Sequence, residues 1–494
     1  MSAQTHPPGV KALFKIILGN AGLLFLAQMG AKAISFIFFL LLARWLGVAQ
    51  FGNLTYAVAI ALLVDMIADA GMARVMLREA SRTPELTERL LGVIVPLKLG
   101  ACVLLYGVTL IILLSLNGTS EIAILFAIIG ASVAFSGPAL LFEQVLHSRA
   151  KFGYVALAHL LLVTAQFAGA ALAHAAGGGA EGVAAMLALG NAVYLGVIVV
   201  GLRRLDVRFT PRLDPAAWRQ TALSAAPYAV VAAMITITPR VEFVVLGQFA
   251  TEAALGSYGA ALRVFEAALI APIAFAVVLT PRFIHFQNRP VAELSELYAH
   301  SARAMLSLAL PVSVVGVLLS DFAVSVLLPP EYAGAGAVLS ILFLAYPALS
   351  LHLLNLAVMI GAQRQLWPAL LMTALILAQA GLAFVLIART QDIGAARALA
   401  LSMAGACVVT SIAVRVWFLD RFNLLRAAAP PAIGGLAAFL AILWISGRDY
   451  AEILAPACAL LAFAAASAPL FVLLPVGRTH ATEQVRVVPP DADA

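Results

Sequence analysis

The chain has 494 residues, of which 63% are hydrophobic and 11% are charged, and its mean hydropathy is +1.03. A soluble domain carries about 25% charged residues, so this composition excludes an ordinary soluble protein. Long apolar stretches recur from end to end and do not alternate with polar residues, which predicts an all-α polytopic membrane protein rather than a β-barrel.

The first apolar stretch imitates a cleavable signal peptide, because Lys11 and Lys15 precede it and Ala31-Lys32-Ala33 resembles a cleavage site. The apolar sequence resumes at once over 34–43, however, so we expect a retained first helix. The three cysteines, Cys102, Cys407 and Cys458, lie in apolar stretches and have neither a disulfide framework nor the spacing of a metal site.

Apolar stretches separated by Gly, Pro and charged residues predict about fourteen transmembrane helices. Their expected spans are 16–43, 52–74, 90–115, 122–147, 153–174, 182–202, 220–247, 254–280, 303–328, 334–360, 366–388, 394–419, 429–446 and 451–474.

Basic residues collect in alternate predicted loops, which fits the positive-inside rule rather than nucleic-acid binding. Four opposite loops, 116–121, 174–182, 248–256 and 329–332, contain no Lys or Arg. We therefore expect both termini in the cytoplasm and the protein in the bacterial inner membrane. The basic loops contain Arg74, Arg78, Arg82 and Arg89; Arg149 and Lys151; Arg203, Arg204, Arg208, Arg212 and Arg219; Arg282, Arg289 and Arg303; Arg364; and Arg421 and Arg426.

A short internal repeat suggests two halves of the same orientation. Leu46-Gly47 followed by Phe51-Gly52-Asn53 at the start of one helix corresponds to Leu246-Gly247 followed by Leu255-Gly256-Ser257. The expected organisation is an N-lobe of six helices over 1–202, a cytoplasmic linker over 203–219 and a C-lobe of six helices over 220–419. A helix pair over 420–475 and a disordered cytoplasmic tail over 476–494 complete it.

Four basic residues interrupt the apolar stretches, namely Lys32, Lys98, Arg240 and Arg263. A charge at membrane depth is costly and normally faces a cavity or a partner. Arg240 and Arg263 lie at similar distances from the turn over 248–256, so they are expected at one depth on neighbouring helices. Two positive charges at one level predict a site for an anion, although each residue could also snorkel or pair with a buried acid.

Buried carboxylates are the candidates for coupling to H+ or Na+. Asp65 and Asp69 are four residues apart and share one helix face, while Glu242 and Glu266 accompany the two arginines. Arg263 and Glu266 could also neutralise each other within one helix. Glu143 is expected near the cytoplasmic surface, and the scattered histidines are interpreted as structural. No catalytic residue, metal site or other cofactor is predicted.

Several motifs resemble bacterial polysaccharide flippases of the multidrug/oligosaccharidyl-lipid/polysaccharide exporter superfamily. The junction of the first two helices, residues 44–56 (RWLGVAQFGNLTY), is similar, as are residues 69–73 (DAGMA) followed by Arg78-Glu79. Arg240-Val241-Glu242 leading to Leu246-Gly247, and residues 330–335 (PEYAGA), match in order and spacing. The resemblance covers the first twelve predicted helices and is patchy after Ala388.

The resemblance implies two six-helix lobes in a V around a central cavity that opens alternately to each side. It also implies a substrate of sugars on undecaprenyl pyrophosphate, for O-antigen or exopolysaccharide synthesis, with Lys32, Arg240, Arg263 and Lys98 as head-group contacts. Membrane lipid, a polysaccharide polymerase and chain-length proteins are the expected partners; nucleic acid is not.

Three other functions stay open at this point. The first is a cation-coupled multidrug extruder, which should present acids rather than bases to its substrates. The second is a peptidoglycan-precursor (lipid II) flippase. The third is a scaffold for polysaccharide synthases that transports nothing.

Overall fold

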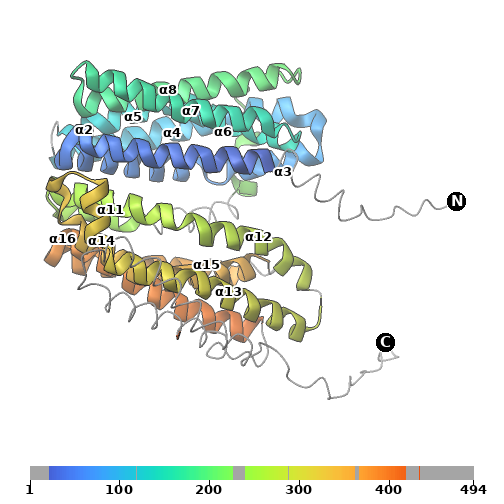
Figure 1. Ribbon diagram of the computed structural model, residues 1–494. Helices are drawn as coiled ribbons and strands as arrows, with labels where there is room; N and C mark the ends of the chain where they lie inside the picture. The colour runs from blue at the N-terminus through green and yellow to red at the C-terminus, as the bar shows by residue number, and fades with distance from the viewer. Residues whose placement is uncertain are drawn as a thin grey trace, which may run out of the picture. The chain divides into compact units, whose positions relative to one another are not determined.

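A computed structural model describes residues 22–117, 120–225, 240–287, 289–361, 366–418 and 433 (Figure 1). Within these ranges the regular structure is helical, and they contain no strand. The all-α membrane fold predicted from the sequence is therefore confirmed. The predicted helices 429–446 and 451–474 lie outside the described residues, apart from residue 433.

The described helices follow the predicted order closely. They are α2 (Gly22–Asp69), α3 (Met72–Arg82), η2 (Pro84–Leu86), α4 (Thr87–Asn117), α5 (Glu121–Ala131), α6 (Val133–Ser148), α7 (Phe152–Ala175), α8 (Gly179–Arg203), α10 (Val241–Phe249), α11 (Glu252–Ala268), α12 (Ile270–Phe286), α13 (Val291–Leu318), α14 (Ser320–Leu327), η4 (Pro330–Tyr332), α15 (Ala335–Gly361) and α16 (Leu366–Trp417).

Seven helices of the described chain are long and apolar enough to cross a membrane, or up to nine if each of two bent pairs counts as one span. Two of the seven, Gln28–Asp69 and Leu370–Trp417, have 42 and 48 residues. A single crossing needs about 20 residues, so these helices are long enough for two crossings each. Both contain a break, at Gly47 (φ 73°) in α2 and at Thr390 and Gln391 in α16. The predicted total of fourteen is not confirmed.

Two predicted helices are bent near their middle. The predicted helix 122–147 is α5 and α6, which meet at 43° around Ser132, and the predicted helix 254–280 is α11 and α12, which meet at 45° around Leu269. The hydroxyl of Ser132 donates to the carbonyl of Ile129. This bond occupies a carbonyl at the end of α5 that the interrupted helix leaves without its usual partner.

The basic stretch after α2 was expected to be a loop, and this expectation is wrong. Residues 70 and 71 turn the chain with positive φ, and a second helix, α3, begins at Met72. Its buried residues, Met72, Val75, Met76 and Ala80, follow the spacing of one helix face, so α3 is amphipathic. A hydropathy criterion misses such a helix because its other face is polar.

Arg303 also differs from its prediction as a loop residue. It lies inside α13, which begins twelve residues earlier than expected, and it is buried. The first turns of α13 are polar on one side, but Leu294, Tyr298 and Ala302 are buried at helical spacing. This periodicity, rather than mean hydropathy, marks the true start of the helix.

The chain divides into two compact units. The described residues of the first come from Met1–Ala267, Ser320–Leu342 and Leu366–Ser402, and those of the second from Ala268–Leu319, Phe343–Gln365 and Met403–Ala494. In the first unit, α3, α4, α6, α7 and α8 share one apolar core. The lobe boundaries predicted at 202, 219 and 419 stay predictions.

The second unit contains a buried polar network. The Tyr298 hydroxyl donates to Asn355 Oδ1 (2.6 Å), and Asn355 Nδ2 donates to the hydroxyls of Thr410 and Ser411 (3.0 Å each). His352 Nδ1 lies 3.2 Å from Thr410 Oγ1. Side-chain hydrogen bonds of this kind join membrane helices that have little hydrophobic drive to associate.

Candidate functional site

The two copies of the sequence repeat pack against each other within the first unit. A Cβ atom on Gly52 would lie 2.5 Å from the carbonyl oxygen of Glu252 and 2.6 Å from the nitrogen of Gly256. A Cβ on Gly256 would lie 2.0 Å from the carbonyl oxygen of Val48. Only glycine permits this approach of one helix start to the other, and we call the contact the glycine junction.

Polar bonds join further turns on the same side of this unit, the side of the predicted loop 248–256. The Tyr332 hydroxyl donates to the carbonyl of Ala43 (3.1 Å), just before the break at Gly47. Arg44 donates to the carbonyls of Val326 and Leu327 at the end of α14 (3.3 and 3.2 Å). These bonds hold distant parts of the sequence together beside the glycine junction.

The two arginines predicted at one depth meet at one carboxylate. Arg240 Nη1 lies 3.4 Å from Glu266 Oε1, and Arg263 Nη1 lies 2.9 Å from Glu266 Oε2. The side chain of Arg240 is only 15% exposed, that of Arg263 20% and that of Glu266 27%. One carboxylate neutralises one guanidinium, so this arginine pair keeps an excess of one positive charge.

The first half of α2 borders the arginine pair. The guanidinium carbon of Arg263 lies 4.0 Å from the centre of the Phe39 ring, a cation–π contact. Lys32 lies seven residues before Phe39, hence on the same face of α2 and about 10 Å away along the axis. Lys32 is exposed, and no carboxylate of the described chain is within ion-pair distance of it.

Glu242 does not join the arginine pair. It is buried in the first turn of α10, where its Oε1 accepts a 2.7 Å hydrogen bond from Gln379 Nε2 of α16. Its Oε2 is buried without a hydrogen-bond partner. An oxygen in this condition is suited to bind a proton or a cation, because leaving it unpaired is costly.

Lys98 is wholly buried and pairs with Asp69. Its Nζ lies 2.8 Å from Asp69 Oδ1, and Asp69 Oδ2 accepts a 3.4 Å bond from the nitrogen of Ala73 in the first turn of α3. Asp65, one turn before Asp69 on α2, is half-buried, and its Oδ1 has no hydrogen-bond partner. Lys98 therefore pairs with a buried acid, which was the alternative to a binding role. Its role as a head-group contact stays a prediction.

The replacement Asp69→Asn should destabilise the protein strongly. It removes the carboxylate in direct contact with the buried ammonium of Lys98 and leaves only the more distant charge of Asp65. Breaking a buried ion pair costs about 3–5 kcal/mol. The purified protein should melt clearly below wild type, whereas Glu293→Gln, which opens the exposed Arg289–Glu293 pair, should cost at most about 1 kcal/mol. Equal melting temperatures for the two variants would contradict the assignment of Asp69 as the ion-pair partner of Lys98.

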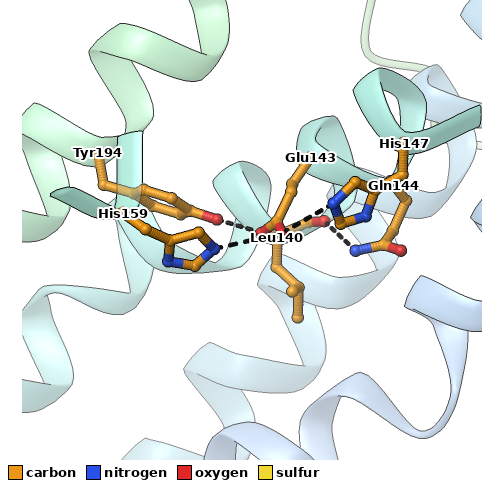
Figure 2. A network of polar contacts seen from close by, with 6 residues as sticks. All are labelled: Leu140, Glu143, Gln144, His147, His159 and Tyr194. Carbon is orange, nitrogen blue, oxygen red and sulfur yellow. Dashed lines mark hydrogen bonds and ion pairs between the residues drawn. The ribbon is translucent and has the colours of Figure 1, made fainter. Parts of the chain in front are cut away.

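A further polar cluster, around Glu143, was not predicted from the sequence. Glu143, which was expected near the cytoplasmic surface, is buried on α6 and contacts His147, His159 and Tyr194 (Figure 2). The spacing of Glu143 and His147, four residues apart, could have indicated that both share one helix face. Nothing in the sequence brings His159 and Tyr194 to that face, because they come from α7 and α8.

Residues 17–287 match the family described as polysaccharide biosynthesis protein. The chain belongs to the polysaccharide biosynthesis protein family. This match confirms the resemblance inferred from the junction of the first two helices and from Arg240-Val241-Glu242. Among curated proteins none matches the sequence significantly.

Solved structures show which fold this family member has. The lipid II flippase MurJ in an inward closed conformation is similar, with a TM-score of 0.76 at 15% identity over 92% of this chain and 99% of that one. An inward-facing multidrug resistance MATE family transporter of the MOP superfamily gives 0.61 at 14% identity, over 78% and 94%. A MOP superfamily transporter from Pyrococcus furiosus gives 0.56 at 14% identity, over 80% and 95%. The chain therefore shares its fold with a lipid II flippase and with transporters of the MOP superfamily.

Proposed function

We propose that this protein is a flippase that moves an undecaprenyl-pyrophosphate-linked oligosaccharide from the cytoplasmic to the outer leaflet of the bacterial inner membrane. Transport proceeds by alternating access, with both termini in the cytoplasm, and serves the synthesis of a surface polysaccharide such as O-antigen or exopolysaccharide. Membership of the polysaccharide biosynthesis protein family and the transporter fold support this proposal. No catalytic step is part of it.

The observation that carries the proposal is the arginine pair. A pyrophosphate is a dense anion, and guanidinium groups bind phosphate oxygens in a bidentate manner. The excess positive charge at Arg240 and Arg263 supplies such a site, with Glu266 as a resident counter-ion that the substrate displaces. Lys32, on the same face of α2 as Phe39, adds a second point of contact along the helix. The lipid tail stays in the bilayer while the sugars cross.

We assign coupling to H+ or Na+ to carboxylates that have an oxygen atom without a hydrogen-bond partner. Glu242 Oε2 and Asp65 Oδ1 both lack a hydrogen-bond partner, whereas both oxygens of Asp69 and of Glu266 are engaged. Glu242 and Asp65 are therefore our first candidates for ion coupling, and Asp69 and Glu266 the weaker ones.

The same fold is compatible with a lipid II flippase and with a multidrug extruder. Lipid II flipping shares the pyrophosphate chemistry, so only the biological outcome distinguishes it. An extruder of cationic drugs fits an excess of positive charge poorly. A scaffold that works only through partners, such as a polymerase or chain-length proteins, would need no buried arginine pair.

Deletion and reconstitution should separate these functions. We expect a strain that lacks the gene to remain viable and lose its surface polysaccharide, measured by immunoblot or staining of cell-surface glycan. Lysis on depletion would indicate lipid II flipping, and a changed drug-resistance profile would indicate a multidrug extruder. The purified protein alone should flip a fluorescent undecaprenyl-pyrophosphate-linked saccharide in liposomes; failure there, with polysaccharide lost in cells, would indicate the scaffold.

A further inference from the structure

The cluster around Glu143 consists of titratable groups from three helices of the first unit. The carboxylate of Glu143 on α6 accepts a hydrogen bond from the Tyr194 hydroxyl of α8 on Oε2. Its Oε1 lies 3.4 Å from His159 Nε2 of α7 and 3.6 Å from His147 Nε2 of α6. Figure 2 shows Tyr194 and His159 approaching the carboxylate from one side and His147 from the other.

Three side chains of the described chain act on the charge of Glu143. They are His159, Tyr194 and His147. Four further helices, α2, α3, α4 and α5, contact α6. On these helices Arg78 pairs with Glu79, and Lys98 pairs with Asp69. Their other charged side chains are Lys32, Arg44, Asp65, Arg74, Arg82, Glu88, Arg89 and Glu121, and none of these is among the groups that act on Glu143.

One proton therefore decides the net charge of the cluster. With both imidazoles neutral and the carboxylate ionised, the cluster carries one negative charge, stabilised by hydrogen bonds from the Tyr194 hydroxyl and from His159 Nε2, while His147 Nε2 lies nearby without a hydrogen bond. With one more proton, on Glu143 Oε1 or on Nδ1 of an imidazole, the cluster is neutral. Histidine is the side chain whose charge changes near physiological pH, and burial favours the neutral form.

The two imidazole rings of the cluster reach the surface of the first unit. Glu143 is only 8% exposed, but the side chains of His147 and His159 are 21% and 30% exposed. His147 lies in the last turn of α6, directly before the basic segment that contains Arg149 and Lys151, a predicted cytoplasmic loop. A proton can thus pass between the predicted cytoplasmic side and the buried carboxylate through the imidazole rings.

A metal ion is not favoured at this position. No group of three His, Cys, Asp or Glu side chains among the described residues has the geometry to hold one. The contacts instead join hydrogen-bond donors directly to a single carboxylate.

We propose that Glu143, His147, His159 and Tyr194 form a proton-binding site that takes up and releases one proton in each transport cycle, distinct from the arginine pair and from Glu242. Tyr194 and His159 belong to α8 and α7, so a shift of α6 against these helices changes how many donors the carboxylate has. The affinity for the proton is then linked to helix packing, and by reciprocity the proton alters that packing. The coupling of this proton to transport rests on the proposed function, whereas the binding of the proton at Glu143 does not.

Infrared difference spectroscopy of the full-length protein in liposomes tests the proton site directly. Between mildly alkaline and mildly acidic buffer, we expect Glu143→Gln to remove one carboxylate from the wild-type difference spectrum or to suppress the associated imidazole signals. The matched control Glu181→Gln replaces an exposed glutamate of α8 and should leave the corresponding signals unchanged. A Glu143→Gln spectrum identical to wild type would overturn the proposal.

A second variant protects the test against misfolding. Tyr194→Phe keeps every titrating group of the carboxylate–imidazole set and removes one donor, so it should move the titration midpoint and lower the melting temperature chiefly in the buffer in which the carboxylate is ionised. An unchanged midpoint would contradict the cluster. A purely structural hydrogen bond would lower the melting temperature without moving the midpoint.

The pH profile of flipping tests the coupling. The wild-type rate for the fluorescent undecaprenyl-pyrophosphate-linked saccharide should change by up to about tenfold per pH unit where one proton limits transport. Glu143→Gln should flatten this profile, and Glu181→Gln should not. A wild-type profile retained in Glu143→Gln would overturn the coupling. If the wild-type protein flips nothing, the proposed function fails, while the infrared spectra still decide whether the proton site exists.

Discussion

Replacing either arginine of the pair should abolish export while the protein still accumulates in the membrane. Each charge-assisted contact to a phosphate contributes about 1.5–3 kcal/mol, so Arg240→Ala or Arg263→Ala should weaken substrate binding by roughly ten- to a hundredfold. The structure adds a reason for a larger loss. Once one arginine is removed, Glu266 neutralises the other, and the site retains no excess positive charge.

Glu266→Gln is the informative partner variant. It removes the resident counter-ion and leaves both guanidinium groups free for the substrate, so binding should be kept or strengthened. Arg289→Ala, at an exposed ion pair, serves as the control and should export normally. The measurements are surface polysaccharide in cells and binding of the labelled lipid-linked saccharide to purified protein. Normal surface polysaccharide in both Arg240→Ala and Arg263→Ala would exclude the pair from the mechanism.

Gly256→Leu should open the glycine junction and stop transport. Its Cβ would meet the backbone carbonyl of Val48, which cannot move aside as a flexible side chain could, so the two helices must separate. Overpacking of this kind costs about 1–3 kcal/mol. A cycle of alternating access needs the junction to close again, and the leucine prevents closure.

Thiol labelling measures this opening. Ser257 is only 8% exposed, so in a background without the three native cysteines Ser257→Cys should react slowly with a water-soluble maleimide. Adding Gly256→Leu should accelerate the reaction. Adding Gly100→Leu instead should not, because no neighbouring atom lies within 4 Å of a Cβ there. Slow labelling and normal flipping in Gly256→Leu would contradict the close approach of Gly256 to Val48, because the leucine would then fit without opening the junction.

The sequence predicted the helices well where hydropathy alone determines them. The spans of α4, α7, α8 and α15 agree with their predictions within a few residues. Prediction failed at α3 and at the start of α13, where one helix face is polar and mean hydropathy falls. It also missed the bends at Ser132 and Leu269, because a bend depends on how the helix packs as well as on its composition.

The candidate site shows the same division between local and tertiary information. The intrahelical pair of Arg263 and Glu266 was foreseen as an alternative, since residues three apart share a helix face. Equal distance from a turn placed Arg240 at the same depth. Which of several acids it would contact depends on the rotation of α10 against α11, and that is tertiary information. For Glu143, the partners His159 and Tyr194 come from other helices, and no local sequence pattern predicts these contacts.

The two bonds of Asp69 have a mechanical consequence. One oxygen holds the buried Lys98 of α4 and the other holds the first turn of α3, across a corner of only two residues. Neither α3 nor α4 can tilt away from α2 without giving up a bond at that shared carboxylate. The corner should therefore be rigid, and α2, α3 and α4 should move as one rigid body when the protein changes conformation.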